Sequence, residues 1–238
     1  GVVFLNYDSE LVHQFKVPSD CQKIAYGIAN RDADVRAKLV NDQWFLSLNK
    51  DIKILRYWDI ERLNDWKLEI GSLLGKHNVL NLLPAIAIAW RLGMSKAEID
   101  QAIKKIKSPV GTMQAIKKDN LILIDDTYNA NPAGVKAALE TLSDYNNAGA
   151  RHCLVPAVKI LILDDILELG PAAREIHQQI GEQIAKMQLA KVILVGRNYA
   201  GLVRKILLQA GFKPEQAIMS QPGLRTVQGE LEKTLQAI

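Results

Sequence analysis

The densest group of polar side chains runs from Asp125 to Pro132 and directly follows an apolar, strand-like run at residues 121–124. In a parallel α/β sheet, ligands gather at the carboxyl ends of the strands, where such a segment lies. A carboxylate there can hold a ribose hydroxyl or a metal ion, and Asn amides can read an adenine edge or an amide substrate. In the alternative, purely structural interpretation, the run is a turn in which Asn131 caps a helix that begins at Pro132. The run is longer than a cap requires, so the sequence favours a ligand-facing role.

A second acidic segment, residues 164–170, follows the predicted strand at 159–163 and precedes a predicted helix that carries His177. Its three carboxylates can bind Mg²⁺ or a substrate ammonium. A loop in which Gly170 and Pro171 begin the next helix accounts for the same residues equally well, so both interpretations stay open.

A third polar group, Lys76-His77-Asn78, begins a helix whose body is almost wholly apolar. The positive end of the helix dipole and these side chains suit an anionic or purine ligand. The alternative, a cap by Asn78 beside a solvated histidine, is favoured by this stretch alone. The run from Gly71 to His77 has three residues between its glycines rather than four, and lacks the Ser/Thr that binds Mg²⁺, so we reject it as a P-loop.

Two parts of the chain with different hydrophobic patterns must position these groups, and they meet near residue 110. The first part reads as short strands joined by local hairpins, followed by a helical pair. The predicted strands are 2–5, 23–28, 35–39, 44–48 and 52–57. The helical pair spans 76–107, where Gly93 ends one helix and Ser95 caps the next with Glu98 three residues on.

The second part alternates strands with helices. The predicted strands are 121–124, 159–163, 191–195 and 216–219, and the predicted helices are 132–143, 172–186, 199–209 and 223–237. This alternation predicts an α/β fold with a mostly parallel sheet and helices on both faces. We therefore expect two domains, 1–110 and 111–238.

Composition restricts the function classes. The 238 residues are 48% hydrophobic and 24% charged, which is typical of a folded globular protein. The net charge is +4, and the sequence has no block of five like charges. It therefore lacks the clustered Lys and Arg that are typical of nucleic-acid binding. No apolar stretch is long enough to cross a bilayer. Cys21 and Cys153 have no companion Cys/His spacing, so we expect a reducing, cytoplasmic location. Because Gly1 opens a strand-like run, we expect the chain to be a fragment.

Several of these segments together resemble the Mur ligases of peptidoglycan synthesis. The similar segments are residues 1–8, 75–81, 92–93, 111–113, 125–132 and 163–170 with His177 and Gly181. Their order and spacing extend the resemblance nearly from end to end. The run Tyr128-Asn129-Ala130-Asn131-Pro132 is similar to that of the family member that adds D-alanyl-D-alanine.

The resemblance implies a three-domain enzyme, of which this chain holds two parts. Residues 1–110 correspond to the end of the central, P-loop-type ATPase domain, and residues 111–238 to the Rossmann-like C-terminal domain. The implied reaction forms ADP: ATP phosphorylates the terminal carboxylate of UDP-N-acetylmuramoyl-tripeptide, the amine of D-alanyl-D-alanine attacks, and phosphate leaves, with Mg²⁺ present. The catalytic and metal-binding residues are expected upstream of Gly1. We therefore expect this chain to be inactive alone. We also expect a monomer, with no nucleic-acid partner and no membrane insertion.

The resemblance also assigns roles position by position. The residues expected to face ATP are His77, Asn78, Asp126, Tyr128, Asn129, Asn131, and Thr112 at the position of the family's arginine. The residues expected to shape the site of the incoming dipeptide are Asp165, Glu168 and His177. Thr112 loses a cationic contact unless Lys117 replaces it. Asp164 replaces a glycine of the family and restricts the turn, and residues 151–158 read as extra sequence before a strand.

Two alternatives stay open. Another member of the superfamily, such as one similar to folylpolyglutamate synthase, is disfavoured by the run at residues 128–132. A non-catalytic nucleotide-binding or interaction module that lost the ATPase would explain Thr112 and Asp164 as early departures from a working site.

Overall fold

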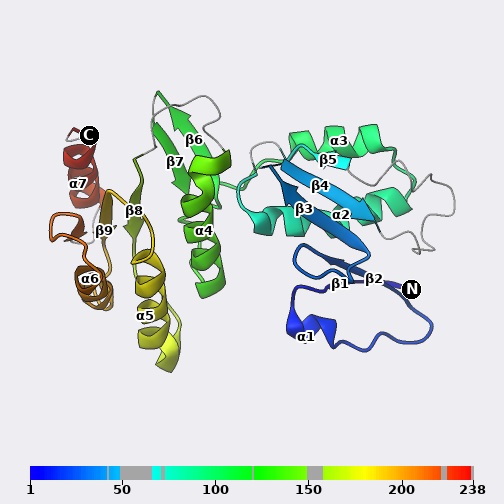
Figure 1. Ribbon diagram of the computed structural model, residues 1–238, viewed down its shortest axis with the longest axis horizontal. Helices are drawn as coiled ribbons and strands as arrows, with labels where there is room; N and C mark the ends of the chain where they lie inside the picture. Colours follow the sequence, from blue (N-terminus) through cyan, green and yellow to red (C-terminus); the bar gives the residue numbers. More distant parts are fainter. Residues whose placement is uncertain are drawn as a thin grey trace. The chain divides into compact units, whose positions relative to one another are not determined.

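The computed structural model describes residues 1–41, 43–48, 66–70, 73–119, 121–148, 158–220 and 224–236. Contacts divide the chain into two compact units, Gly1–Asp125 and Asp126–Ile238 (Figure 1). Each unit has its own cluster of buried apolar side chains. The boundary expected near residue 110 lies inside the first unit of this division, and the assignment of each part to a ligase domain stays a prediction.

The first unit is built on a five-stranded sheet. In spatial order the strands are β1 (Val2–Asn6), β2 (Gln22–Gly27), β3 (Val35–Val40), β4 (Gln43–Leu48) and β5 (Trp66–Leu68). The first three strands run parallel, with the short helix α1 (Glu10–His13) between β1 and β2. Within the described part of this sheet, the pairs β3–β4 and β4–β5 are antiparallel, so the expected local hairpin forms between β3 and β4. The parallel strands β1, β2 and β3 are not joined by hairpins.

Two helices follow the sheet. Helix α2 (Lys76–Arg91) packs on β2 and β3 and turns one apolar face inward, because its buried side chains recur every three or four residues. Those side chains are Val79, Leu82, Leu83, Ile86, Ala87 and Trp90. Gly93, at φ +90°, follows the end of α2. Ser95 and Glu98 form a full capping box at the start of α3 (Lys96–Lys105), as predicted.

The first unit ends in a two-stranded antiparallel hairpin, β6 (Gln114–Lys118) and β7 (Leu121–Asp125). The register pairs Gln114 with Asp125. Strand β7 was expected from its apolar run, whereas β6 is mostly polar and gave no such signal. The hairpin places Asp125 at the end of a strand, where the polar run begins.

The second unit contains a parallel sheet, with strands in the order β10 (Ala217–Met219), β9 (Lys191–Leu194) and β8 (Ile160–Leu163). The prediction that the strand at 121–124 belongs to this sheet is wrong, because β7 pairs antiparallel with β6 in a separate sheet. Its helical elements are α4 (Pro132–Ala148), the 3₁₀ turn η2 (Gly170–Ala172), α5 (Ala173–Ile184), α6 (Ala200–Gln209) and α7 (Leu224–Gln236). Helix α5 packs against α4 and α6. The strand expected at 52–57 lies outside the described residues, as do residues 151–157 of the extra segment expected at 151–158. Among the helices that are described, none is long and apolar enough to span a bilayer.

Candidate functional site

A carboxylate joins the two loops that leave the carboxyl ends of β8 and β9. Asp165, two residues after β8, accepts the backbone N–H of Asn198 at 2.7 Å and that of Tyr199 at 3.1 Å. Its carboxylate also lies against the α-carbon of Gly196, where a β-carbon would overlap it. Both carboxylate oxygens therefore bind the main chain of the neighbouring loop. This geometry favours a positioning role for Asp165, and its direct contact with a dipeptide stays a prediction.

A buried histidine also contacts the same two loops. His177, on α5, is 1% exposed and stacks on the ring of Tyr199 with 4.2 Å between ring centroids. Its Nε2 accepts the backbone N–H of Ile166 at 3.0 Å, and its Nδ1 lies 2.7 Å from the carbonyl oxygen of Ala173. Because a carbonyl only accepts, Nδ1 carries the hydrogen, and these partners assign the neutral tautomer. The ring therefore positions the loop at residues 164–170.

The loop that Asp165 and His177 hold presents other polar groups to solvent. Asp164 and Glu168 are exposed, and Glu168 has a φ of +60°. Asp164 accepts the backbone N–H of Asp165 at 2.7 Å, and its own backbone is not left-handed. Replacing the family's glycine by Asp164 therefore strains no turn in this structure, and Glu168 remains a candidate to meet a ligand.

The run from Asp126 to Asn131 lies between β7 and α4. Asn131 accepts the backbone N–H of Gly134 at 2.8 Å and precedes Pro132, the first residue of α4, so the expected helix cap is confirmed. Tyr128 is 81% exposed, Asn129 is exposed, and Asp126 is half-buried. One residue of the run thus caps a helix, while Tyr128 and Asn129 extend into solvent, and their contact with ATP stays a prediction.

The polar group at the start of α2 is arranged differently from a cap. Asn78 uses its side-chain N–H to donate to the carbonyl oxygen of Leu74 at 2.7 Å, and α2 has no side-chain cap at Gly75. His77 is half-buried rather than solvated. The capping alternative for Asn78 is therefore wrong, and the N-terminus of α2 keeps the polar character that suits an anionic or purine ligand.

The first unit contains a clamp that the sequence analysis missed. Asp8, two residues after β1, accepts three backbone N–H groups that follow β2: Ile28 at 2.7 Å, Ala29 at 3.0 Å and Asn30 at 2.8 Å. A β-carbon on Gly27 would lie 2.7 Å from its Oδ1. Its partners lie 20 to 22 residues away in the chain, so no local pattern could reveal them.

Thr112, at the position of the family's arginine, is exposed and donates its backbone N–H to the carbonyl of Pro109 at 3.1 Å. Gly111 and Met113 on either side have positive φ values of 71° and 45°, so the backbone turns sharply at this point. Lys117, the suggested substitute cation, is exposed on β6. An arginine fits at Thr112 without burial, and whether Lys117 acts in its place stays a prediction.

No group of three His, Cys, Asp or Glu side chains within the described ranges is placed to hold a metal ion. The described residues therefore do not form a Mg²⁺ site by themselves. We derive no catalytic step through the metal from this chain.

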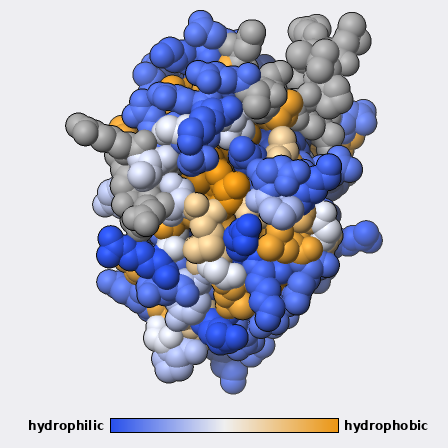
Figure 2. Space-filling view, turned by 90° about the vertical axis from the view of Figure 1, so that its left-hand side faces the viewer, coloured by the Kyte–Doolittle hydropathy of each residue, from blue (hydrophilic) through white to orange (hydrophobic). Residues whose placement is uncertain are grey.

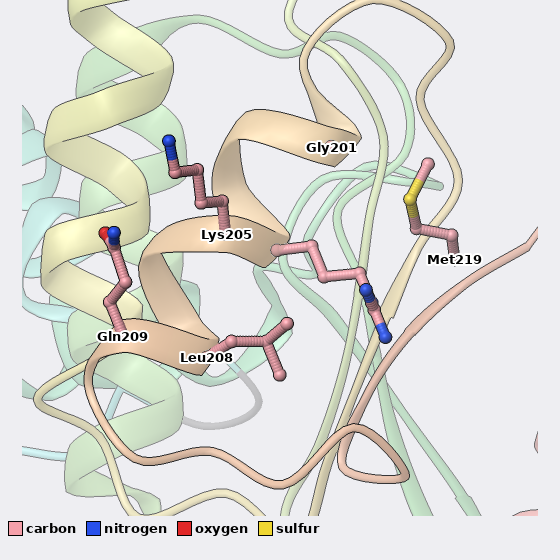
Figure 3. Close-up of a pocket in the computed structure, with 6 residues that line it drawn as sticks. Gly201, Lys205, Leu208, Gln209 and Met219 are labelled. Carbon is pink, nitrogen blue, oxygen red and sulfur yellow. The ribbon is translucent and has the colours of Figure 1, made fainter.

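A shallow hollow of about 500 Å³ lies between α6 and β10, and no sequence signal pointed to it. Its lining residues are Gly201, Arg204, Lys205, Leu208, Gln209 and Met219. Arg204 donates from Nε to the carbonyl of Ala217 at 2.8 Å, while Lys205 and Gln209 extend away from Met219 (Figure 3). Seen from the side of α6 and α7, hydrophobic atoms form small patches among hydrophilic ones (Figure 2). The polar side chains that line the hollow therefore do not point toward one common ligand position.

Comparisons with known proteins find relatives for about half of the chain. Residues 112–223 match the family model of the Mur ligase, glutamate ligase domain. A UDP-N-acetylmuramoyl-tripeptide–D-alanyl-D-alanine ligase from Haemophilus influenzae is 33% identical over 128 residues, which cover 53% of this chain and 26% of that protein. The enzyme of the same name from Bacillus subtilis is 31% identical over 126 residues, covering 52% of this chain and 26% of the relative.

Solved structures extend the likeness in fold to the whole chain. MurF from Acinetobacter baumannii superposes with a TM-score of 0.73 at 20% identity, covering all of this chain and 46% of that one. MurF ligase from Thermotoga maritima, solved in complex with ADP, gives a TM-score of 0.60 at 17% identity and covers 98% of this chain and 54% of its own. The matched part spans about a quarter of the length of the curated relatives. The chain therefore folds like part of a Mur ligase, and its residues 112–223 are similar to the Mur ligase, glutamate ligase domain.

Proposed function

We propose that this chain is part of an ATP-dependent, ADP-forming amide ligase that adds D-alanyl-D-alanine to UDP-N-acetylmuramoyl-tripeptide in peptidoglycan synthesis. The match at residues 112–223 carries the proposal, because it includes both polar loops, 126–131 and 164–170. Relatives named for this activity at 31% and 33% identity support the choice of substrates. The run at residues 128–132 adds a sequence signature of the same activity.

The reaction activates a carboxylate and then forms an amide. The γ-phosphate of ATP passes to the terminal carboxylate of the tripeptide, and the free amine of the dipeptide attacks the resulting acyl phosphate. Phosphate leaves, and the nitrogen of the dipeptide, an ammonium in water, gives up two protons in total and keeps one hydrogen in the amide. Such phosphoryl transfer depends on positioning and on positive charge near the transferred group.

The described residues fit the binding part of this chemistry. In the first unit, His77 and Asn78 lie at the polar start of α2, where the helix dipole favours a nucleotide. At the start of the second unit, Asp126, Tyr128 and Asn129 follow directly after β7. We propose His77 and Asn78 as nucleotide-binding residues of the first unit, and Asp126, Tyr128 and Asn129 as those of the second. Thr112 takes the place of an arginine that would bind phosphate.

The dipeptide belongs to the carboxyl edge of the sheet in the second unit. Asp165 and His177 fix the loop at 164–170 to the loop after β9. Glu168 remains exposed on that loop, where its carboxylate can meet the ammonium of the incoming dipeptide. Asp165 and His177 shape this site through the backbone they hold.

Hydrogen exchange measured by mass spectrometry tests these assignments on the 238-residue chain. ADP at millimolar concentration should slow exchange at residues 76–78 and 126–131, and D-alanyl-D-alanine should slow it at 164–170. Inorganic phosphate and L-alanyl-L-alanine serve as matched controls and should give weaker protection. Unchanged exchange with both ligands would contradict the proposal, as would equal protection by the controls.

A further inference from the structure

Arg197 lies at the carboxyl edge of the parallel sheet of the second unit. Strand β9 ends at Leu194, and Val195 still donates its N–H to the carbonyl of Leu163 at 2.9 Å. Arg197 is therefore the second residue beyond the last sheet-like hydrogen bond. Ligands of open α/β sheets bind beyond this edge, where loops from neighbouring strands meet.

The main chain on both sides of Arg197 is held in place. Gly196 is buried against the carboxylate of Asp165. On the other side, Asn198 and Tyr199 donate their N–H groups to that carboxylate, and the ring of Tyr199 stacks on His177. The point from which the Arg197 side chain extends is therefore fixed at this edge.

The guanidinium of Arg197 is available for such a ligand. Its side chain is exposed, and none of the hydrogen bonds or ion pairs within the described part of the chain includes it. Both oxygens of Asp165, which holds the main chain next to Arg197, already accept backbone N–H groups. A guanidinium offers parallel N–H donors that match a carboxylate in two-point geometry.

The adjoining loop provides the opposite charge. Glu168 is exposed three residues after Asp165, the residue that binds the loop of Arg197. The two joined loops thus present a cation and an anion at one edge of the sheet. This pairing is complementary to a zwitterion, an amino acid or short peptide with a free amine and a free carboxylate.

We propose that Arg197 binds the terminal carboxylate of the amine substrate and so selects amines that carry a carboxylate. This inference rests on the proposed function and names the group that recognises one end of its second substrate. Arg197 is a specificity residue here, and the reacting amine lies at the other end of the dipeptide.

Isothermal titration calorimetry of the 238-residue chain tests the inference with D-alanyl-D-alanine and with its C-terminal amide. Wild type should bind the acid about 10- to 100-fold more tightly than the amide, as expected for a charge-assisted pair. Arg197→Ala should bind the acid as weakly as wild type binds the amide, and Arg197→Lys should lie between. Arg174→Ala is the matched control, because Arg174 is another exposed arginine of the same unit, and its affinity should stay within about twofold of wild type.

The outcomes separate the two proposals. Tight binding of the acid that survives in Arg197→Ala would overturn the role of Arg197 and leave the proposed function standing, as would equal binding of acid and amide. A wild-type chain that binds neither form would count against the proposed function itself, and the role of Arg197 would fall with it. Thermal unfolding of each variant checks the fold, which an exposed substitution should leave unchanged.

Discussion

The carboxylate of Asp165 packs against the α-carbon of Gly196 so closely that no β-carbon fits between them. The first unit repeats the arrangement with Asp8 and Gly27. In both units an aspartate after one parallel strand accepts the N–H groups that follow the neighbouring strand. Each clamp fixes two loops at the carboxyl edge of parallel strands, and in the second unit this is the edge to which we assign the dipeptide.

A methyl group at Gly196 should open the clamp. We expect Gly196→Ala to lower the free energy of unfolding of the second unit by roughly 1–3 kcal/mol, because the carboxylate must move away from its N–H partners. Urea denaturation measures the loss. Gly201→Ala is the control, since a β-carbon there meets nothing within 4 Å and should change stability by less than about 1 kcal/mol. Equal effects of the two substitutions would contradict the clamp.

His177→Phe tests the hydrogen bond to the loop apart from the stacking on Tyr199. The phenyl ring keeps the stack and removes the Nε2 acceptor, so the buried N–H of Ile166 loses its partner. We expect a loss of about 1–3 kcal/mol and faster hydrogen exchange at Ile166. His13→Phe, at an exposed histidine, should have little effect. Unchanged exchange at Ile166 would show that His177 does not hold the loop.

The capping box of α3 predicts a pH-dependent stability. Hydrogen bonds from the Ser95 side chain and backbone hold the pKa of Glu98 below its ordinary value. The stabilisation is thus complete above the unfolded pKa, about 4.3, and is lost as pH falls through the lower folded pKa. Glu98→Gln should be less stable than wild type at neutral pH, and the gap should close in acid. Chemical denaturation across this range checks it, and a constant gap would refute it.

Much of this fold follows from short-range patterns. The apolar spacing of α2, the capping box of Ser95 and Glu98, and the alternation that builds the parallel sheet are all local signals. The parallel pairing of β1, β2 and β3 was missed, because pairing depends on contacts between residues distant in sequence. Strand β5 was missed because three residues show too little periodicity.

In the candidate site, too, local sequence signals predicted some features and missed others. The polar loops were visible as runs of unusual composition at predicted strand ends, and the cap by Asn131 followed from the Pro that comes next. The roles of Asp165 and His177 as loop anchors were not visible, because Gly196 and Tyr199 approach them only in the folded chain. Asp8 was missed for the same reason.

Restoring the family's arginine should raise activity if the proposed reaction is correct. Thr112 is exposed, so Thr112→Arg should leave stability unchanged while placing a cation at the turn before β6. In the complete enzyme we expect kcat to rise by at least about tenfold, because cationic groups at a transferring phosphoryl group often contribute that much. Lys117→Ala should lower kcat if Lys117 now supplies the charge. No change in kcat for either variant would remove this turn from the phosphate site.

The most direct test of the central claim is a ligation assay on the product of the complete reading frame that contains this chain. ADP release and the new amide are followed together, with each substrate omitted in turn. The proposal predicts one ADP per ligated product, formed only when ATP, UDP-N-acetylmuramoyl-tripeptide and D-alanyl-D-alanine are all present. ADP release that ignores D-alanyl-D-alanine, or ligation of a different amine in its place, would contradict it.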